Sequence, residues 1–161
     1  MYSNLLNESE LQASLINLDL ANLVLEFGAG GQHFAIRAKD VERVIGYHHS
    51  RRSNTEHDWA DFHYTTNVGA LPVMTFNRLA GIQTAVTDRR PSIVILSEHH
   101  NETVPRCGLL VHDLRPDVQA AEEILVGDVP PHLNGSSHLF SATAVLAGRQ
   151  LPLLRHPLHL A

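Results

Sequence analysis

Histidine is the residue type in this 161-residue chain that most strongly suggests chemistry, because there are twelve of them. The densest group lies in one polar stretch and consists of His48, His49, His57, Asp58, Asp61 and His63. A transition-metal site needs such side chains to converge in a fixed geometry, held by neighbours that orient them. The usual spacings, H-E-x-x-H and paired C-x-x-C, are absent, so we interpret these histidines as solvated loop residues. A metal- or small-ligand-binding β domain that uses residues 48–63 remains the alternative function.

The sequence shows no residues that could form a nucleophilic catalytic site. The single cysteine, Cys107, lies five residues before His112, so on one strand the two side chains would face opposite sides. No G-x-S-x-G, P-loop or G-x-G-x-x-G motif occurs, and the glycines of residues 28–31 lie between two predicted strands, where they form a turn and no phosphate cradle. The sequence therefore predicts no enzyme, no catalytic residue and no cofactor.

Charge and hydropathy argue against a nucleic-acid-binding protein and against a membrane-spanning protein. The net charge is −5, and the only basic pairs are Arg51-Arg52 and Arg89-Arg90, so the concentrated basic face that nucleic acid requires is missing. No window approaches the roughly 18 consecutive apolar residues of a membrane helix. The start of the chain lacks the pattern of a secretory signal, and we expect a cytoplasmic protein.

Periodicity indicates which elements position these residues. An N-terminal helical segment is predicted over residues 1–21, with Leu11, Leu15 and Leu18 on one helix face. From Leu23 the period becomes two, with Leu23, Leu25 and Phe27 predicted to face a core, and residues 34–36 resume the alternation after the glycines. This pattern predicts a β-hairpin.

The remaining segments alternate between short strands and polar connections. Strands are predicted at residues 71–76, entered through Pro72, and at residues 92–96 and 107–111, which form a second hairpin. A third hairpin is predicted from residues 139–146 and 151–154. A short helical turn that leads into a strand is predicted at residues 40–46, a short helix or helical turn at residues 118–125, and a long polar loop at residues 48–67. Short strands with glycine turns indicate a mostly β protein with barrel or sandwich architecture and short helices.

Three blocks of this order resemble the CheW-like family of chemotaxis coupling proteins. Residues 23–47 are similar to the family's opening hairpin and its "V-x-x-I" turn. Residues 67–74 are similar to its "N-L-R-G-x-x-x-P-V" run, and residues 92–96 followed by 107–113 to its "V-G-L-x-V-D" strand. The closing hairpin follows in the expected place.

The resemblance implies two small five-stranded SH3-like barrels that share a core, in a CheW-like domain over residues 22–161. It implies a non-enzymatic signalling adaptor that couples chemoreceptors, or a related sensory input, to a CheA-type histidine kinase in a chemotaxis or pilus-motility system. The implied partners are the kinase's regulatory domain and the cytoplasmic tip of the receptor, without nucleic acid or membrane insertion.

Residues at the family's docking positions follow from the same resemblance. Val41, Arg43 and Val44 match its receptor-facing segment, and Val68 and Gly69 match its second segment. Val68 stands where the family usually has an arginine, which makes this chain a divergent member.

Overall fold

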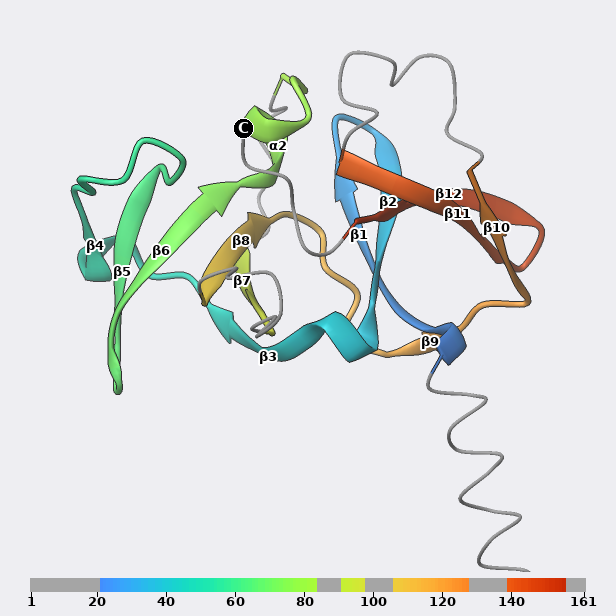
Figure 1. Cartoon of the computed structure of the whole chain (residues 1–161), viewed down its shortest axis with the longest axis horizontal. Helices are drawn as coiled ribbons and strands as arrows, with labels where there is room; N and C mark the ends of the chain where they lie inside the picture. The colour runs from blue at the N-terminus through green and yellow to red at the C-terminus, as the bar shows by residue number, and fades with distance from the viewer. Residues whose placement is uncertain (1–20, 84–90, 98–105, 128–138, 156–161) are drawn as a thin grey trace, which may run out of the picture.

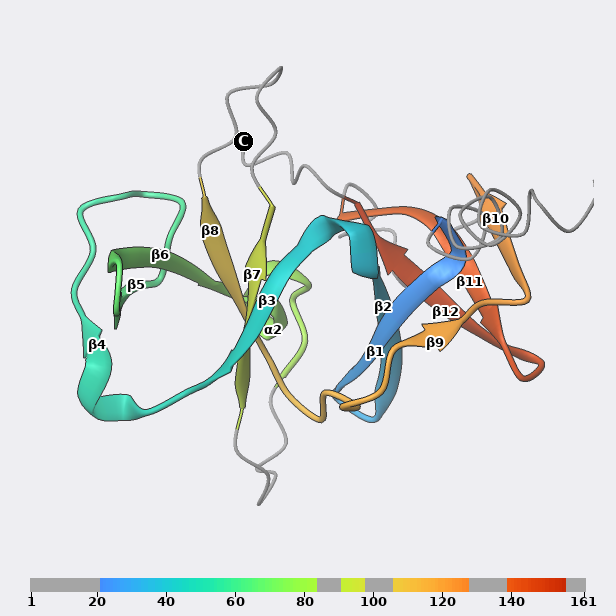
Figure 2. The same ribbon diagram turned by 90° about the horizontal axis from the view of Figure 1, so that it is seen from below.

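Two β-sheets lie side by side in the computed structural model, which describes residues 21–83, 91–97, 106–127 and 139–155 (Figure 1). The view from below shows the same arrangement, with β3 leading from the first hairpin towards β4 (Figure 2) and pairing with β7. The predicted N-terminal helical segment lies outside the described residues, apart from its last position. Among the described residues, no helix is long and apolar enough to cross a membrane.

Sheet A is built from both ends of the described chain. Its strands are β1 (Leu23–Ala29), β2 (Gln32–Arg37), β9 (Gln119–Ala120), β10 (Glu123–Val126), β11 (Phe140–Leu146) and β12 (Arg149–Leu154). They are ordered β10-β11-β12-β2-β1-β9. Neighbours pair antiparallel except β12 and β2, which run parallel and join the C-terminal hairpin to the N-terminal one.

Sheet B is built from one continuous stretch of chain between these two parts. Its strands are β3 (Val41–Gly46), β4 (Arg52–Ser53), β5 (Phe62–Thr66), β6 (Gly69–Thr75), β7 (Ser92–Leu96) and β8 (Cys107–Val111). They are ordered β3-β7-β8-β6-β5-β4, with β6 and β8 parallel. Three short helices complete the described elements: η1 (Ala38–Asp40), η2 (His49–Arg51) and α2 (Phe76–Leu79).

The three predicted hairpins are present. The turn between β1 and β2 is made by Gly30 and Gly31, whose φ angles of 58° and 80° favour glycine. Ala147 and Gly148 play the same part between β11 and β12, with φ angles of 49° and 76°. Strands β7 and β8 pair antiparallel, and four of the five residues in β7 are buried, as the apolar run predicts.

Four local predictions are wrong in whole or in part. A helical turn does lead into a strand here, but the turn is η1 and ends at Asp40, so residues 41–45 already belong to strand β3. Residues 118–125 form β9 and most of β10, with no helix. The predicted loop 48–67 contains η2, β4 and β5, which leaves residues 54–61 as the connection. Strand β1 is buried on both faces, because sheet A curls and covers the face that was expected to meet solvent.

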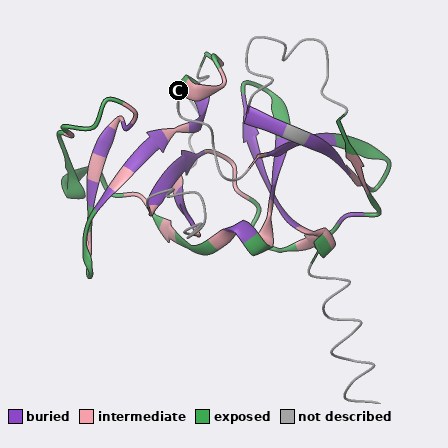
Figure 3. Cartoon of the chain, viewed as in Figure 1, coloured by how far each residue is buried: buried purple, intermediate pink, exposed green. Residues whose placement is uncertain are grey.

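Both sheets share one core. Its centre is a cluster of phenylalanines in which Phe76 of α2 meets Phe27 and Phe34 of sheet A, at ring-centroid distances of 4.7 Å and 4.9 Å. Phe140 of β11 stacks on Phe34 at 5.6 Å. Each sheet also encloses a smaller apolar cluster of its own. This is the arrangement of two SH3-like barrels about a common core, with buried segments concentrated along the inner strands (Figure 3). The strand count differs from the predicted five, since each sheet contains six described strands once the two-residue β4 and β9 are included.

Candidate functional site

Strand β3 carries three of the residues matched to the family's docking positions, at one edge of sheet B. Arg43 and Val44 are exposed, whereas Val41 is half-buried and packs against the shared core. The register with β7 shifts between Val41 and Arg43, which makes Glu42 a β-bulge. Arg106 holds the Glu42 carboxylate through Nε and Nη2, at 2.9 Å and 3.0 Å. The carboxylate of the bulge residue Glu42 is therefore already bound by Arg106. Of the three matched residues, only Arg43 and Val44 are exposed.

The other two matched residues lie at the turn between β5 and β6. Val68 is 71% exposed, and its backbone N–H donates to the hydroxyl of Thr66 at 3.3 Å. That hydroxyl donates in turn to the Gly69 carbonyl at 2.7 Å. Gly69 has a φ of 123°, a conformation that other residues rarely adopt. The turn itself therefore explains this glycine, and Val68 is the outward-facing residue of the pair.

A surface pocket lies between the edge of β3 and strand β5. It has a volume of about 230 Å³ and is lined by Arg43, Ile45, Gly46, His48, Arg51, Tyr64, Thr65, Thr66 and Asn67. The pocket brings together Arg43 from the first matched segment and Asn67, the neighbour of Val68 in the second. Val41 and Val44 take no part in its lining.

Tyr64 fixes the distance between the two walls of this pocket. Its hydroxyl donates to the Gly46 carbonyl at 3.1 Å and accepts from the backbone N–H of His48 at 3.0 Å. The ring stacks on Tyr47 at 5.8 Å and belongs to the buried cluster of sheet B. A buried tyrosine with a satisfied hydroxyl gives the end of β3 a defined place beside β5.

Sequence reasoning missed most of the pocket. His48, Arg51 and Tyr64 all lie in the stretch that was predicted to be loop. A usable signal existed, because Phe62 and Tyr64 alternate with polar residues, as expected for a strand with one buried face. The polar composition around this short strand hid the pattern.

The histidines do not converge. The ring of His57 meets that of His63 edge-on at 5.4 Å, while the carboxylate of Asp61 is paired with Arg78. The pair at positions 99–100 lies outside the described residues. In the ranges that the structure describes, no group of three or more histidine, cysteine, aspartate or glutamate side chains could hold a metal ion. The alternative of a metal site at residues 48–63 therefore has no support.

Cys107 has no catalytic environment. It is buried at the start of β8, and this burial raises the pKa of its thiol to about 11. Such a thiol is protonated near neutral pH and is a weak nucleophile. His112 follows the other end of the strand, where its carbonyl accepts from the backbone N–H of Gly28 at 2.9 Å.

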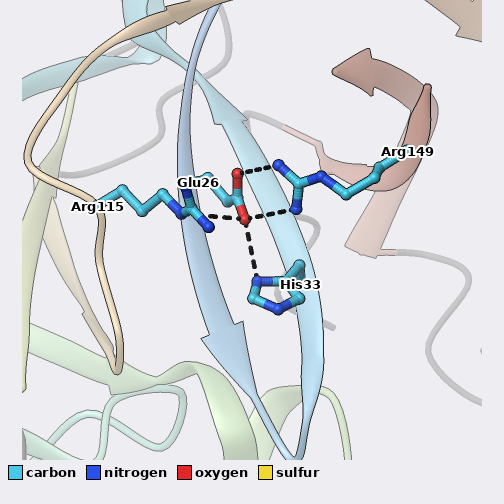
Figure 4. A network of polar contacts seen from close by, with 4 residues as sticks. All are labelled: Glu26, His33, Arg115 and Arg149. Carbon is cyan, nitrogen blue, oxygen red and sulfur yellow. Dashed lines mark hydrogen bonds and ion pairs between the residues drawn. The ribbon is translucent and has the colours of Figure 1, made fainter. Parts of the chain in front are cut away.

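A buried carboxylate in sheet A is the other concentration of charge (Figure 4). The side chain of Glu26 is fully buried, and Arg149 binds it through two hydrogen bonds of 2.9 Å and 3.0 Å. His33 Nδ1 lies 3.0 Å and Arg115 Nε 3.4 Å from the same carboxylate. The hydrogen bonds from Arg149 hold the pKa of Glu26 below its ordinary value. This network ties strands β1, β2 and β12 to the connection after β8, and its role is structural.

Comparison with known proteins decides the family. The model of the CheW-like domain matches residues 23–160. The chain belongs to the CheW-like domain family. Membership places it among scaffold domains, which are not enzymes, as the sequence predicted.

A solved structure shares the fold. The crystal structure of the scaffolding protein TtCheW from Thermoanaerobacter tengcongensis superposes with a TM-score of 0.66. The match covers 83% of this chain and 88% of that one, at 15% sequence identity. No curated protein sequence matches this CheW-like chain significantly.

Proposed function

We propose that this CheW-like protein is a cytoplasmic adaptor that couples a chemoreceptor, or a related sensory input, to a CheA-type histidine kinase in a chemotaxis or pilus-motility system. The observation that carries the proposal is the family match over residues 23–160, which includes both sheets and their shared core. The protein that it resembles in structure is itself described as a scaffolding protein.

The surface that we assign to partner binding consists of the β3 edge and the β5–β6 turn, with Arg43, Val44, Val68 and Gly69. Four large apolar side chains are exposed among the described residues, and Val44 and Val68 are two of them. An edge strand also has backbone groups that can pair with another chain. Apolar side chains beside free backbone groups are typical of protein-binding surfaces.

Direct binding measurements test the proposal. Purified protein is titrated with the kinase regulatory domain and, separately, with the cytoplasmic tip of the receptor, by isothermal calorimetry. We expect the wild-type chain to bind at least one of them. Val68→Asp should weaken that binding by about tenfold or more, because it places a charge in an interface.

Val126→Asp is the matched control, since Val126 is 80% exposed on β10 of the other sheet and receives the same chemical change. It should leave the affinity unchanged. A folded wild-type protein that binds neither partner would refute the adaptor role.

A further inference from the structure

The pocket between β3 and β5 exists because sheet B does not close there through backbone pairing. Strand β3 stands at one end of the sheet and β5 next to the other, and no described backbone pair links them. Tyr64 bridges the gap at Gly46 and His48. The rest of the gap is lined by side chains, with Arg43 on β3 and Asn67 at the hairpin turn.

Two guanidinium groups of this pocket have no partner among the described residues. Neither Arg43 nor Arg51 has an ion pair or hydrogen bond with any described residue, whereas four other arginines each bind a carboxylate: Arg78, Arg106, Arg115 and Arg149. The acid next to Arg43 in the sequence, Glu42, is taken by Arg106. In a protein of net charge −5, no acid of the described ranges compensates this positive site.

The other residues that line the pocket contribute neutral hydrogen-bond donors and no acidic side chain. None of the nine lining residues carries a carboxylate. The side chains of Asn67 and Thr65 form no hydrogen bond within the described part of the chain, and they can donate to a ligand. The planar guanidinium of arginine matches a carboxylate through two parallel hydrogen bonds. The lining therefore selects an anion with oxygen acceptors.

We infer that this pocket binds carboxylate side chains from an acidic segment of a partner protein. The volume of about 230 Å³ suits one or two carboxylates. It does not suit a nucleic-acid backbone, which needs many phosphate contacts along an extended basic face. Val68, next to Asn67, adds an exposed apolar contact of the kind that a protein segment uses and a small anion does not. The inference deepens the proposed function, on which it rests for the protein nature of the partner.

The probe is a blocked hexapeptide of glutamate and leucine, titrated into the full-length, isotope-labelled chain and followed by NMR. A peptide with glutamine in place of each glutamate is the control. We expect the acidic peptide to shift resonances of the pocket lining. Its affinity should fall by about tenfold or more in the double variant Arg43→Gln with Arg51→Gln, because both guanidinium contacts are lost.

The matched control variant is Arg37→Gln with Arg155→Gln, which removes the same charge outside the pocket and should bind like the wild type. Equal binding by both double variants would overturn the inference, as would equal binding of the glutamine peptide. Inorganic phosphate that binds the pocket as tightly as the acidic peptide would also overturn it, since the site would then be a general anion site.

A second measurement separates this inference from the adaptor role. The same variants are titrated with the kinase regulatory domain and the receptor tip. If the wild type binds a partner and the Arg43→Gln, Arg51→Gln variant binds it equally well, the pocket inference fails and the adaptor role stands. If the wild type binds the acidic peptide at the pocket and neither partner, the adaptor role fails instead.

Discussion

Glu26 illustrates how one buried charge is accommodated in this fold. Its carboxylate has no access to solvent, yet Arg149 and Arg115 reach it from the surface, where each keeps about half of its side chain in water. Hydrogen bonds to the ionised form compensate for the loss of hydration. They also lower the pKa of Glu26, so the charged form is favoured in the folded state.

Glu26→Gln should lower the free energy of unfolding at pH 7 by about 1.5–3 kcal/mol, the range for hydrogen bonds that involve a charged group. The folded-state pKa of Glu26 lies below its ordinary value of 4.5, so the stabilisation is complete above that pH and is lost as the pH falls through the folded-state value. Urea denaturation between pH 7 and pH 3 should therefore show the two proteins converging in acid.

Glu123→Gln serves as the control for this prediction, because Glu123 is an exposed acid on β10 and its replacement should change stability little. A Glu26→Gln protein as stable as the wild type at pH 7 would contradict the structural role of the network. The partners of Glu26 lie up to 123 positions away in sequence. No local pattern could have revealed the two arginine partners, and periodicity placed Glu26 on the open face of its strand.

At the scale of elements, the sequence predicted correctly those strands and turns that depend on short-range patterns of residues. The first and third hairpins were correct because alternating apolar residues and glycine turns specify them without distant contacts. The second was correct because a continuous apolar run and a second apolar segment flank a polar connection. The helical turn that leads into β3 was placed too far along the chain, because the bulge at Glu42 spaces the apolar residues 41, 44 and 45 as a helix would. Strands β9 and β10 are short and contain no fully buried residue, so their alternation was too weak to recognise.

Gly108 shows how tightly the strands of sheet B pack. A Cβ atom there would lie 2.7 Å from Ile93 Cγ2 and 3.1 Å from Leu71 Cδ2. Gly108→Ala should therefore destabilise the protein by about 1–3 kcal/mol through overpacking. Thermal and urea denaturation measure the effect.

Gly46→Ala is the matched control, because a Cβ atom at Gly46 meets nothing within 4 Å and the residue also ends a strand of sheet B. It should be nearly neutral. Similar stability losses in the two variants would argue against the close packing at Gly108.

At the scale of the whole molecule, we expect the shared core to make the two sheets unfold as one cooperative unit. Phe76 leaves sheet B through α2, and its ring packs against both Phe27 and Phe34 of sheet A, which stack on each other. Sheet A and sheet B are also joined by the backbone bridge between Gly28 and His112. Neither barrel can lose this contact without exposing apolar surface on the other.

Phe76→Ala should lower the free energy of unfolding by about 3–5 kcal/mol and should affect both sheets together. Fluorescence of Trp59, the only tryptophan, and far-UV circular dichroism should report coincident urea transitions in the wild type and in the variant. If the Ala variant fails to fold, Phe76→Leu gives a milder version of the same test. A second, unshifted transition in circular dichroism alone would show that the sheets unfold separately.

The site was predictable only in part at this scale. The family resemblance supplied five residues on two segments, and the structure brings Arg43 and the neighbour of Val68 to one pocket. His48, Arg51 and Tyr64 could not be assigned to that pocket, because their positions depend on how β5 pairs with β6 and where the end of β3 lies beside it.

The parallel pairing of β12 with β2 has a consequence for biosynthesis. Sheet B is complete once residue 111 has left the ribosome, whereas sheet A needs residues 149–154 to close around its first hairpin. In the nascent chain, the β1–β2 hairpin therefore lacks its β12 neighbour while sheet B forms. We expect the growing polypeptide to expose the apolar faces of that hairpin to chaperones until the last strand arrives.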